Sequence, residues 1–335
     1  MAQLLSSRNI YLFDFMKNIF LFGLLIFFIS CNSDFDVELQ ERPNYANDDD
    51  GDPVIENIKD NDEVKENFQF GTGEGGFCYG YGNPDANVSD IVLPLVVPID
   101  HDISEYLPVV RSQGKQGSCV AWAAGYYLKS FQENYEDEQN DIISFDNEMS
   151  PAYIYNQIKV TDCSGGSVIQ HALDTIVSQG IVDWELMLYN ENECDTQPDD
   201  EQKELAEPNK IENYFYLDPE MVFDQTKAAL LMNQPVVIAI TIDRSYFGAR
   251  DQNGEFIYRK FKSADGGHAM LVVGYDDERN AFKVVNSWGK SWGNEGFVWI
   301  DYKAFKEAGD LSSDFPVLCE AWITNDVAVP QPASL

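Results

Sequence analysis

The chain has little positive charge: across 335 residues, 22 Lys and Arg stand against 57 Asp and Glu, a formal net charge of 22 − 57 = −35. Nucleic-acid binding and charge-driven binding to anionic membranes both depend on Lys and Arg, so both functions are excluded. Histidine is scarce, with 3 residues, and the 6 cysteines form no CxxC pair. Because no spacing predicts a zinc site, we expect neither a metal nor a cofactor. A hydrophobic content of 44% still allows a packed core.

The amino-terminal apolar run, residues 19–29, is too short for a transmembrane helix, which needs about 20 apolar residues. It follows Lys17, and a small residue precedes Cys31. This layout predicts an export signal over residues 1–30, with Met16 as an alternative start. The small residue before Cys31 resembles a bacterial lipobox, which implies cleavage there and lipidation of the thiol. An ordinary signal peptide with a coincidental cysteine is the alternative.

An acidic segment follows, with 13 acidic and 3 basic residues between positions 32 and 67, a net charge of 3 − 13 = −10. Such a segment buries too little apolar surface to offset its ordering entropy, so we predict a disordered tether. Together with a Gly-rich joint, the lipidated tether spans residues 31–90. The folded domain is predicted at 91–328, with a tail at 329–335. The expected location is the bacterial cell envelope, at the outer membrane or the cell surface.

The first chemically informative segment is a glycine-punctuated loop that leads into Cys119. From Cys119 to about Tyr135, Ala, Leu and aromatic residues recur at helical spacing, so Cys119 is predicted at a helix start. Unpaired N–H groups and the helix dipole favour an anion there, which lowers a thiol pKa and populates the nucleophilic thiolate. The alternative is a buried structural cysteine.

A second segment places His268 at the head of a β-forming run, residues 269–275. After the turn-like residues 276–280, another β-forming run contains Asn286. A hairpin through this turn brings Asn286 beside His268, where its side-chain oxygen can accept the ring N–H without adding a charge. A cysteine, a histidine and an orienting amide are the components of thiol-based acyl transfer. A strand-end histidine and a turn-capping asparagine are the structural alternatives.

These segments resemble the papain-like cysteine peptidases over roughly residues 95–325. The similarity is carried by Gln113-Gly-Lys-Gln-Gly-Ser-Cys119, by Cys163-Ser-Gly-Gly166, by Gly267-His268-Ala269, by Asn233-Gln-Pro-Val236 and by the block Asn286-Ser-Trp288-Gly-x-x-Trp292-Gly. Cys119 and His268 are 268 − 119 = 149 residues apart, within the family's usual separation.

The resemblance implies a role for each matching residue. Cys119 would be the nucleophile and His268 the general base and acid, with a Cys119 thiolate and a protonated His268 as the resting state. Asn286 would orient the imidazole, and Trp288 would shield that pair from water. Gln113 would donate to the oxyanion together with the Cys119 N–H, and such a donor contributes about 2.7–4 kcal/mol to transition-state stabilisation.

Gly165, Gly166 and Gly267 would bind substrate, with the first two offering backbone groups to an extended peptide. We therefore expect a monomeric cysteine peptidase, an endopeptidase acting on protein or peptide substrates. Two alternatives stay open: acyl transfer to amines by the same nucleophile, as in a transpeptidase or amidase, and a non-catalytic surface binding module on the same fold. No long helical inhibitory propeptide is evident between residues 32 and 95.

The sequence departs from the family pattern at two positions near the nucleophile. Gln116 replaces a cysteine three residues before it, and Val120 replaces the usual aromatic residue after it. Cys163 thereby loses its customary partner. In an oxidising exported compartment we predict the disulfides Cys163–Cys194 and Cys78–Cys319, with free thiols as the alternative.

The predicted fold class is α+β, a papain-like fold with the active-site cleft between two lobes. The helical lobe is expected at about 105–212 and the β-sheet or barrel lobe at about 213–325. Further helices are predicted at 151–159, 167–179 and 218–232. Strands are predicted at 235–242, 269–275, 281–288, 296–302 and 317–323.

Overall fold

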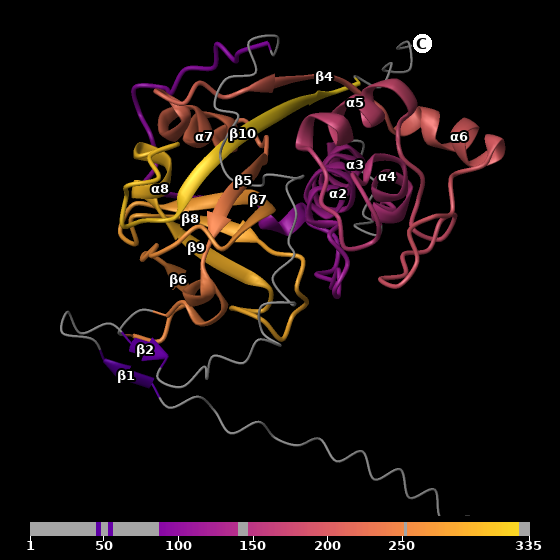
Figure 1. Cartoon of the computed structure of the whole chain (residues 1–335). Helices are drawn as coiled ribbons and strands as arrows, with labels where there is room; N and C mark the ends of the chain where they lie inside the picture. Colours follow the sequence, from indigo (N-terminus) through magenta and orange to yellow (C-terminus); the bar gives the residue numbers. More distant parts are fainter. Residues whose placement is uncertain (1–44, 48–52, 56–86, 140–146, 251–252, 328–335) are drawn as a thin grey trace, which may run out of the picture. The chain divides into compact units, whose positions relative to one another are not determined.

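A mixed β-sheet is the centre of the protein, whose computed structural model describes residues 45–47, 53–55, 87–139, 147–250 and 253–327 (Figure 1). Its strands run in the order β4-β10-β5-β7-β8-β9-β6, and β3 also pairs with β7. The strands of this sheet are β3 (Asp100–Asp102), β4 (Ile211–Tyr216), β5 (Val236–Ile242), β6 (Ile257–Tyr258), β7 (Gly266–Asp276), β8 (Ala281–Val285), β9 (Phe297–Asp301) and β10 (Val317–Asp326). Two further short strands, β1 (Tyr45–Asn47) and β2 (Pro53–Ile55), pair antiparallel with each other.

The central strands form because their sequences are apolar without interruption. All seven residues of β5 are buried, which is the pattern of a strand covered on both faces. β7 and β8 make the predicted antiparallel hairpin, and Asn280 in the turn between them has a φ of 52°, a conformation that Asn tolerates better than most residues. The predicted strands are therefore confirmed, except that β8 ends at Val285 and not at residue 288. Strands β3, β4 and β6 were not predicted.

The helices come mainly from the first half of the domain. Their bounds are η1 (Ser104–Tyr106), α2 (Cys119–Ala121), η2 (Trp122–Lys129), α3 (Ser130–Gln139), α4 (Pro151–Ile158), α5 (Ile169–Gln179), α6 (Asp200–Ala206), η3 (Glu207–Asn209), α7 (Val222–Leu231), η4 (Arg244–Gly248) and α8 (Tyr302–Lys306). They contact the sheet at several strands, with α2 and η2 against β7, α5 against β4 and α8 against β9 and β10. In Figure 1, α2 to α6 gather on one side of the sheet, and α7 and α8 lie on another.

The helix that begins at Cys119 differs from the prediction in two respects. It extends to Gln139 rather than Tyr135, and the eight residues Trp122–Lys129 form a π-helix between α2 and α3. All eight π-helical residues are buried. A segment buried on every side has no apolar stripe, so its periodicity carries no signal that separates a π-helix from an α-helix.

Two other helices begin near their predicted residues and one does not. Ser150 caps α4 by accepting the Tyr153 N–H, and Gly180 ends α5 with a φ of 84°. The helix predicted from Asp218 begins only at Val222. Residues 218–221 form a turn instead, in which the Met221 N–H donates to the Asp218 carbonyl and the Asp218 carboxylate accepts the Glu220 N–H.

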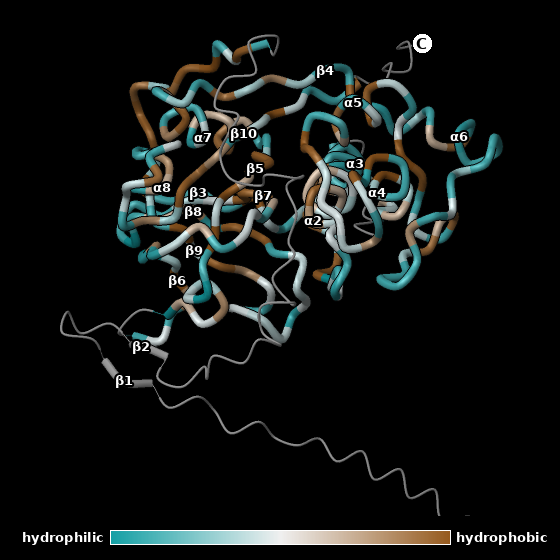
Figure 2. The backbone as a smooth tube through the Cα atoms, viewed as in Figure 1, coloured by the Kyte–Doolittle hydropathy of each residue, from teal (hydrophilic) through white to brown (hydrophobic). Residues whose placement is uncertain are grey.

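The architecture is α+β, as predicted, with apolar residues concentrated in the central strands, which are largely brown in Figure 2. Within the described part of the chain, no helix has the length and apolar character needed to span a membrane. The same residues contain no group of three or more His, Cys, Asp or Glu side chains that could hold a metal ion. The predicted signal, tether and lipidation site at Cys31 lie outside the described residues.

Candidate active site

Cys119 is the first residue of α2 and is fully buried, with 0% of its surface exposed. Among the described residues, it is the cysteine that takes part in no disulfide. Backbone N–H groups of Ala269, Val120 and Cys119 lie near enough to its sulfur to lower the thiol pKa. Since Ala269 directly follows His268 in β7, the thiol lies against the strand that carries the histidine.

His268 and Asn286 meet across the β7–β8 hairpin, with 2.8 Å between His268 Nε2 and Asn286 Oδ1. The same Oδ1 accepts the backbone N–H of Ser287 at 2.7 Å. A backbone N–H can only donate, so the atom facing it must be the amide oxygen, and His268 Nε2 must therefore carry a proton. In the neutral ring, Nδ1 is then the basic nitrogen, as a general base requires.

Burial acts on the pKa of both reacting groups. It raises the pKa of Cys119 to about 11, although the three backbone donors act in the opposite direction. It lowers the pKa of His268 to about 4, although the bond to Asn286 opposes this change. The N–H groups at the helix start lower the thiol pKa, as expected, but the loss of hydration is larger, so the net shift of the pKa is upward. The Cys119 thiolate and His268 imidazolium expected at rest then require that the attraction between the two charges offsets the cost of burying each of them.

Trp288 stacks on the His268 ring with 4.8 Å between centroids. Behind it, Phe247 stacks on Trp288 at 4.9 Å, and Tyr246 and Trp292 approach its edge or face at 5.5 and 5.0 Å. The placement of Trp288 agrees with its expected shielding role. The roles of Tyr246 and Phe247 could not be predicted from the sequence, since no pattern in η4 links it to the segment of residues 286–293.

Gln113 lies beside the asparagine block because residues 111–113 run antiparallel to residues 287–289. The Gln113 N–H donates to the Ser287 carbonyl at 2.8 Å, and the Gly289 N–H donates to the Arg111 carbonyl at 3.1 Å. The Ser287 hydroxyl also donates to Gln113 Oε1, and Gln113 Nε2 donates to the Gln116 carbonyl at 2.8 Å. An amide NH₂ has two donors, so one is held by Gln116 while the other can serve an oxyanion.

Tyr127 and Tyr189 also hold this site, and neither was singled out in the sequence. The Tyr127 hydroxyl donates to the Asn286 carbonyl at 3.1 Å, and the Tyr189 hydroxyl donates to the Gln113 carbonyl at 2.7 Å. Tyr127 is 159 positions away from Asn286 in sequence, and Tyr189 is 76 positions away from Gln113. No local spacing could have indicated these contacts.

The loop with Gly165 and Gly166 packs directly on the segment before Cys119. The Gly117 N–H donates to the Cys163 carbonyl at 3.1 Å. A Cβ on Gly117 would lie 2.5 Å from the Gly165 carbonyl oxygen, so only glycine fits there. Gly267, the third predicted substrate-binding glycine, lies in β7 opposite Thr241 of β5.

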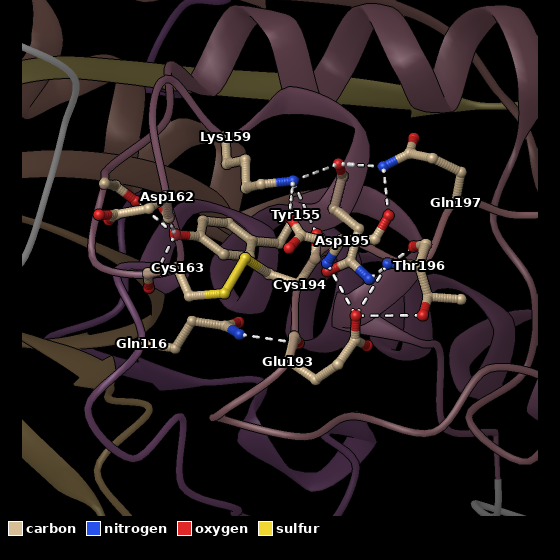
Figure 3. Close-up of polar contacts among 12 residues, drawn as sticks. Gln116, Tyr155, Lys159, Asp162, Cys163, Glu193, Cys194, Asp195, Thr196 and Gln197 are labelled. Carbon is tan, nitrogen blue, oxygen red and sulfur yellow. Dashed lines mark hydrogen bonds and ion pairs between the residues drawn. A yellow bond between two sulfur atoms is a disulfide. The ribbon is translucent and has the colours of Figure 1, made fainter.

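The predicted disulfide Cys163–Cys194 is present, with 5.6 Å between the two Cα atoms. Gln116, which replaces the family cysteine, donates its side-chain N–H to the carbonyls of Asn190 and Glu193 at 3.3 and 3.2 Å, in the segment that carries Cys194 (Figure 3). The glutamine thus connects the nucleophile segment to residues 190–194, and the disulfide connects the loop at Cys163 to the same residues.

The second departure from the family pattern, Val120, is fully buried in the core. Cys319 also takes part in a disulfide. Its predicted partner Cys78 lies outside the described residues, so that pairing stays a prediction.

Comparison with known proteins identifies the family. Residues 97–313 match the model of the papain family cysteine proteases, which is more than half of the chain. The chain belongs to this family. It is therefore a cysteine peptidase, a hydrolase acting on protein or peptide substrates.

Individual relatives are distant. An uncharacterized peptidase C1-like protein of Acanthamoeba polyphaga mimivirus is 29% identical over 231 residues, covering 65% of this chain and 70% of the relative. The gamete and mating-type specific protein A of Dictyostelium discoideum is 28% identical over 214 residues, covering 59% of this chain but only 41% of the relative. The crystal structure of xylellain, a cysteine protease from Xylella fastidiosa, superposes with a TM-score of 0.59 at 22% identity, covering 76% of this chain and 96% of xylellain.

Proposed function

We propose that the protein is an endopeptidase that cleaves peptide bonds through a thioester on Cys119. The observation that carries this proposal is the meeting of three groups from distant segments. The Cys119 thiol lies beside the Ala269 N–H, and the adjoining His268 is held by Asn286 at 2.8 Å. A thiol beside an oriented imidazole is the arrangement that generates a nucleophile at neutral pH.

In this mechanism, His268 Nδ1 removes the thiol proton as the sulfur attacks the scissile carbonyl. The Cys119 N–H and the second N–H of the Gln113 side chain stabilise the oxyanion that forms. The protonated His268 then donates to the leaving amine, and the thioester is hydrolysed by water that His268 activates. Both reacting side chains are fully buried, so a substrate carbonyl reaches the sulfur only when the groups covering it move aside.

Labelling with an epoxysuccinyl inhibitor tests the assignment of the nucleophile. Wild type should incorporate one equivalent, whereas Cys119→Ala should incorporate none and should lose hydrolysis of peptide substrates. The double variant Cys163→Ala/Cys194→Ala provides the control, because it removes two cysteines outside the site and leaves no new thiol for the inhibitor to label. Labelling that persists in Cys119→Ala would make another cysteine the reactive one.

The proposed location is the bacterial cell envelope, with a lipid on Cys31 and residues 32–90 as the spacer. Support comes from the sequence alone: the short apolar run after Lys17, the small residue before Cys31, and the acidic composition that follows. Cys31→Ser should move the protein from the membrane fraction to the soluble fraction. A mutant that still sediments with membranes would refute the lipid anchor, and it would leave the peptidase assignment untouched.

A further inference from the structure

The loop 162–166, which borders the nucleophile segment, is organised by one buried hydroxyl, that of Tyr155 in α4. This hydroxyl lies 3.3 Å from the carbonyl oxygen of Asp162 and 3.1 Å from that of Cys163, and its shortest contact is to the carbonyl oxygen of Gly165. Figure 3 shows Tyr155 against the loop that carries Asp162 and Cys163. A phenol has a single proton to donate, so the shortest contact, to Gly165, is its principal hydrogen bond.

The other polar groups of the two glycines are also engaged inside the loop. The Gly165 N–H donates to the Asp162 carbonyl at 2.9 Å, and the Gly166 carbonyl accepts the Val160 N–H at 3.0 Å. The remaining backbone group of the pair is the Gly166 N–H. It is therefore the group that the loop can offer to a substrate.

The direction of that N–H follows from the Tyr155 contact. The Gly165 carbonyl and the Gly166 N–H belong to the same planar trans peptide unit, in which C=O and N–H point in opposite directions. The Gly165 carbonyl is turned inward, toward the Tyr155 hydroxyl and the space beside Gly117. The Gly166 N–H consequently points away from the interior of the loop.

We propose that Tyr155 is a positioning residue for substrate binding: its hydroxyl sets the Gly165–Gly166 peptide plane so that the Gly166 N–H donates to a backbone carbonyl of the bound peptide. Tyr155 itself does not touch the reacting atoms. The inference rests on the proposed function, in which Gly165 and Gly166 form part of the substrate site. Tyr155 suits this role because α4 holds its ring fully buried.

The test removes the hydroxyl alone and compares substrates with and without one backbone carbonyl. Tyr155→Phe and wild type are assayed on a blocked peptide and on variants of it in which one backbone carbonyl before the scissile bond is reduced to CH₂, each carbonyl in turn, to find the one that pairs with the loop. The matched control is Tyr153→Phe, since Tyr153 is also buried in α4 but its hydroxyl donates to Gln179 at 3.3 Å, away from the loop. Rates are normalised to the sites titrated by the epoxysuccinyl inhibitor, so that only folded enzyme is counted.

We expect wild type and Tyr153→Phe to lose about 10-fold in kcat/KM when the carbonyl is removed, which corresponds to one hydrogen bond. Tyr155→Phe should be about 10-fold slower on the intact peptide, mainly through KM, and should show no further loss on the reduced peptide. If removal of the substrate carbonyl lowers kcat/KM equally in Tyr155→Phe and in wild type, the proposal is overturned. A wild type that hydrolyses none of the peptides and takes up no inhibitor would instead overturn the proposed function.

Hydrogen exchange gives a second readout that does not require catalysis. Amides of residues 162–166 should exchange faster in Tyr155→Phe than in wild type, because the loop loses the donor that three of its carbonyls surround. Tyr153→Phe should leave exchange in this loop unchanged. Unchanged exchange in Tyr155→Phe would show that the hydroxyl does not organise the loop.

Discussion

Removal of the Cys163–Cys194 disulfide provides a quantitative test of how the loop region beside the nucleophile is stabilised. The two cysteines are 31 positions apart. In the chain-entropy model, closing a loop of that length lowers the entropy of the unfolded chain by about 12 cal/mol/K, which corresponds to about 3.7 kcal/mol at 25 °C. We therefore expect Cys163→Ala/Cys194→Ala to lower the free energy of unfolding by about 3–4 kcal/mol.

The folded state should survive this change, because other contacts also hold the segment that carries Cys194. The Lys159 ammonium donates to the Cys194 carbonyl at 2.7 Å, and the Gln116 side chain donates to the carbonyls of Asn190 and Glu193 (Figure 3). The effect should then fall on the unfolded state, and activity at temperatures well below the melting transition should change by less than about threefold.

Urea unfolding, monitored by tryptophan fluorescence and by circular dichroism, measures the change in the free energy of unfolding. Coincident transitions with the two probes check two-state behaviour. The measurements belong in a Cys119→Ala background, which removes both self-digestion and thiol exchange. Each single variant, Cys163→Ala and Cys194→Ala, should lose about as much as the double variant, because either one opens the loop. A loss under about 1 kcal/mol in the double variant would refute the loop-entropy account.

Three further predictions concern the site itself. Asn286→Ala removes the acceptor that orients His268, so kcat should fall about 10- to 100-fold in steady-state assays, and a change confined to KM would contradict that role. Burial lowers the pKa of His268 from 6.5 to about 4. As the pH falls below 6.5, the unfolded state therefore binds a proton before the folded state does. At pH 4 this lowers the free energy of unfolding by about 3 kcal/mol relative to pH 8. The free energy of unfolding should therefore fall more between pH 8 and pH 4 in wild type than in His268→Gln. Parallel curves of unfolding free energy against pH would disprove the lowered pKa of His268. Gly117→Ala should destabilise the fold by about 1–3 kcal/mol, since the added Cβ would lie 2.5 Å from the Gly165 oxygen, and an unchanged Tm would show that the loop can move aside.

Much of the site can be predicted from the sequence because its residues occur in short segments with strong local signals. Cys119 begins a helix after a glycine-rich loop, His268 lies in β7, and Asn286 directly follows β8, which one turn joins to β7. A hairpin brings its two strands together by local geometry alone, so the His268–Asn286 contact follows from the turn. The pairing of Cys163 with Cys194 could also be predicted, because Gln116 had removed the customary partner.

Other features depend on contacts between segments that no local pattern connects. The π-helix over Trp122–Lys129 is buried on every side, and the start of α7 at Val222 depends on a turn stabilised by Asp218. The net shift of the Cys119 pKa could not be predicted, because the helix start lowers it but the burial that raises it depends on segments from the whole fold.

The sequence by itself determined which residues have the chemistry for the reaction and on which strands and helices they lie. Only the tertiary structure decided the environment of those residues: the burial that opposes charge on Cys119 and His268, the aromatic stack on Trp288, and the hydroxyl of Tyr155 beneath the Gly165 carbonyl. The physical reason is that chemical type and local backbone preference are properties of a few neighbouring residues. Desolvation and packing are instead sums over atoms from the whole fold, which become defined only when distant segments meet.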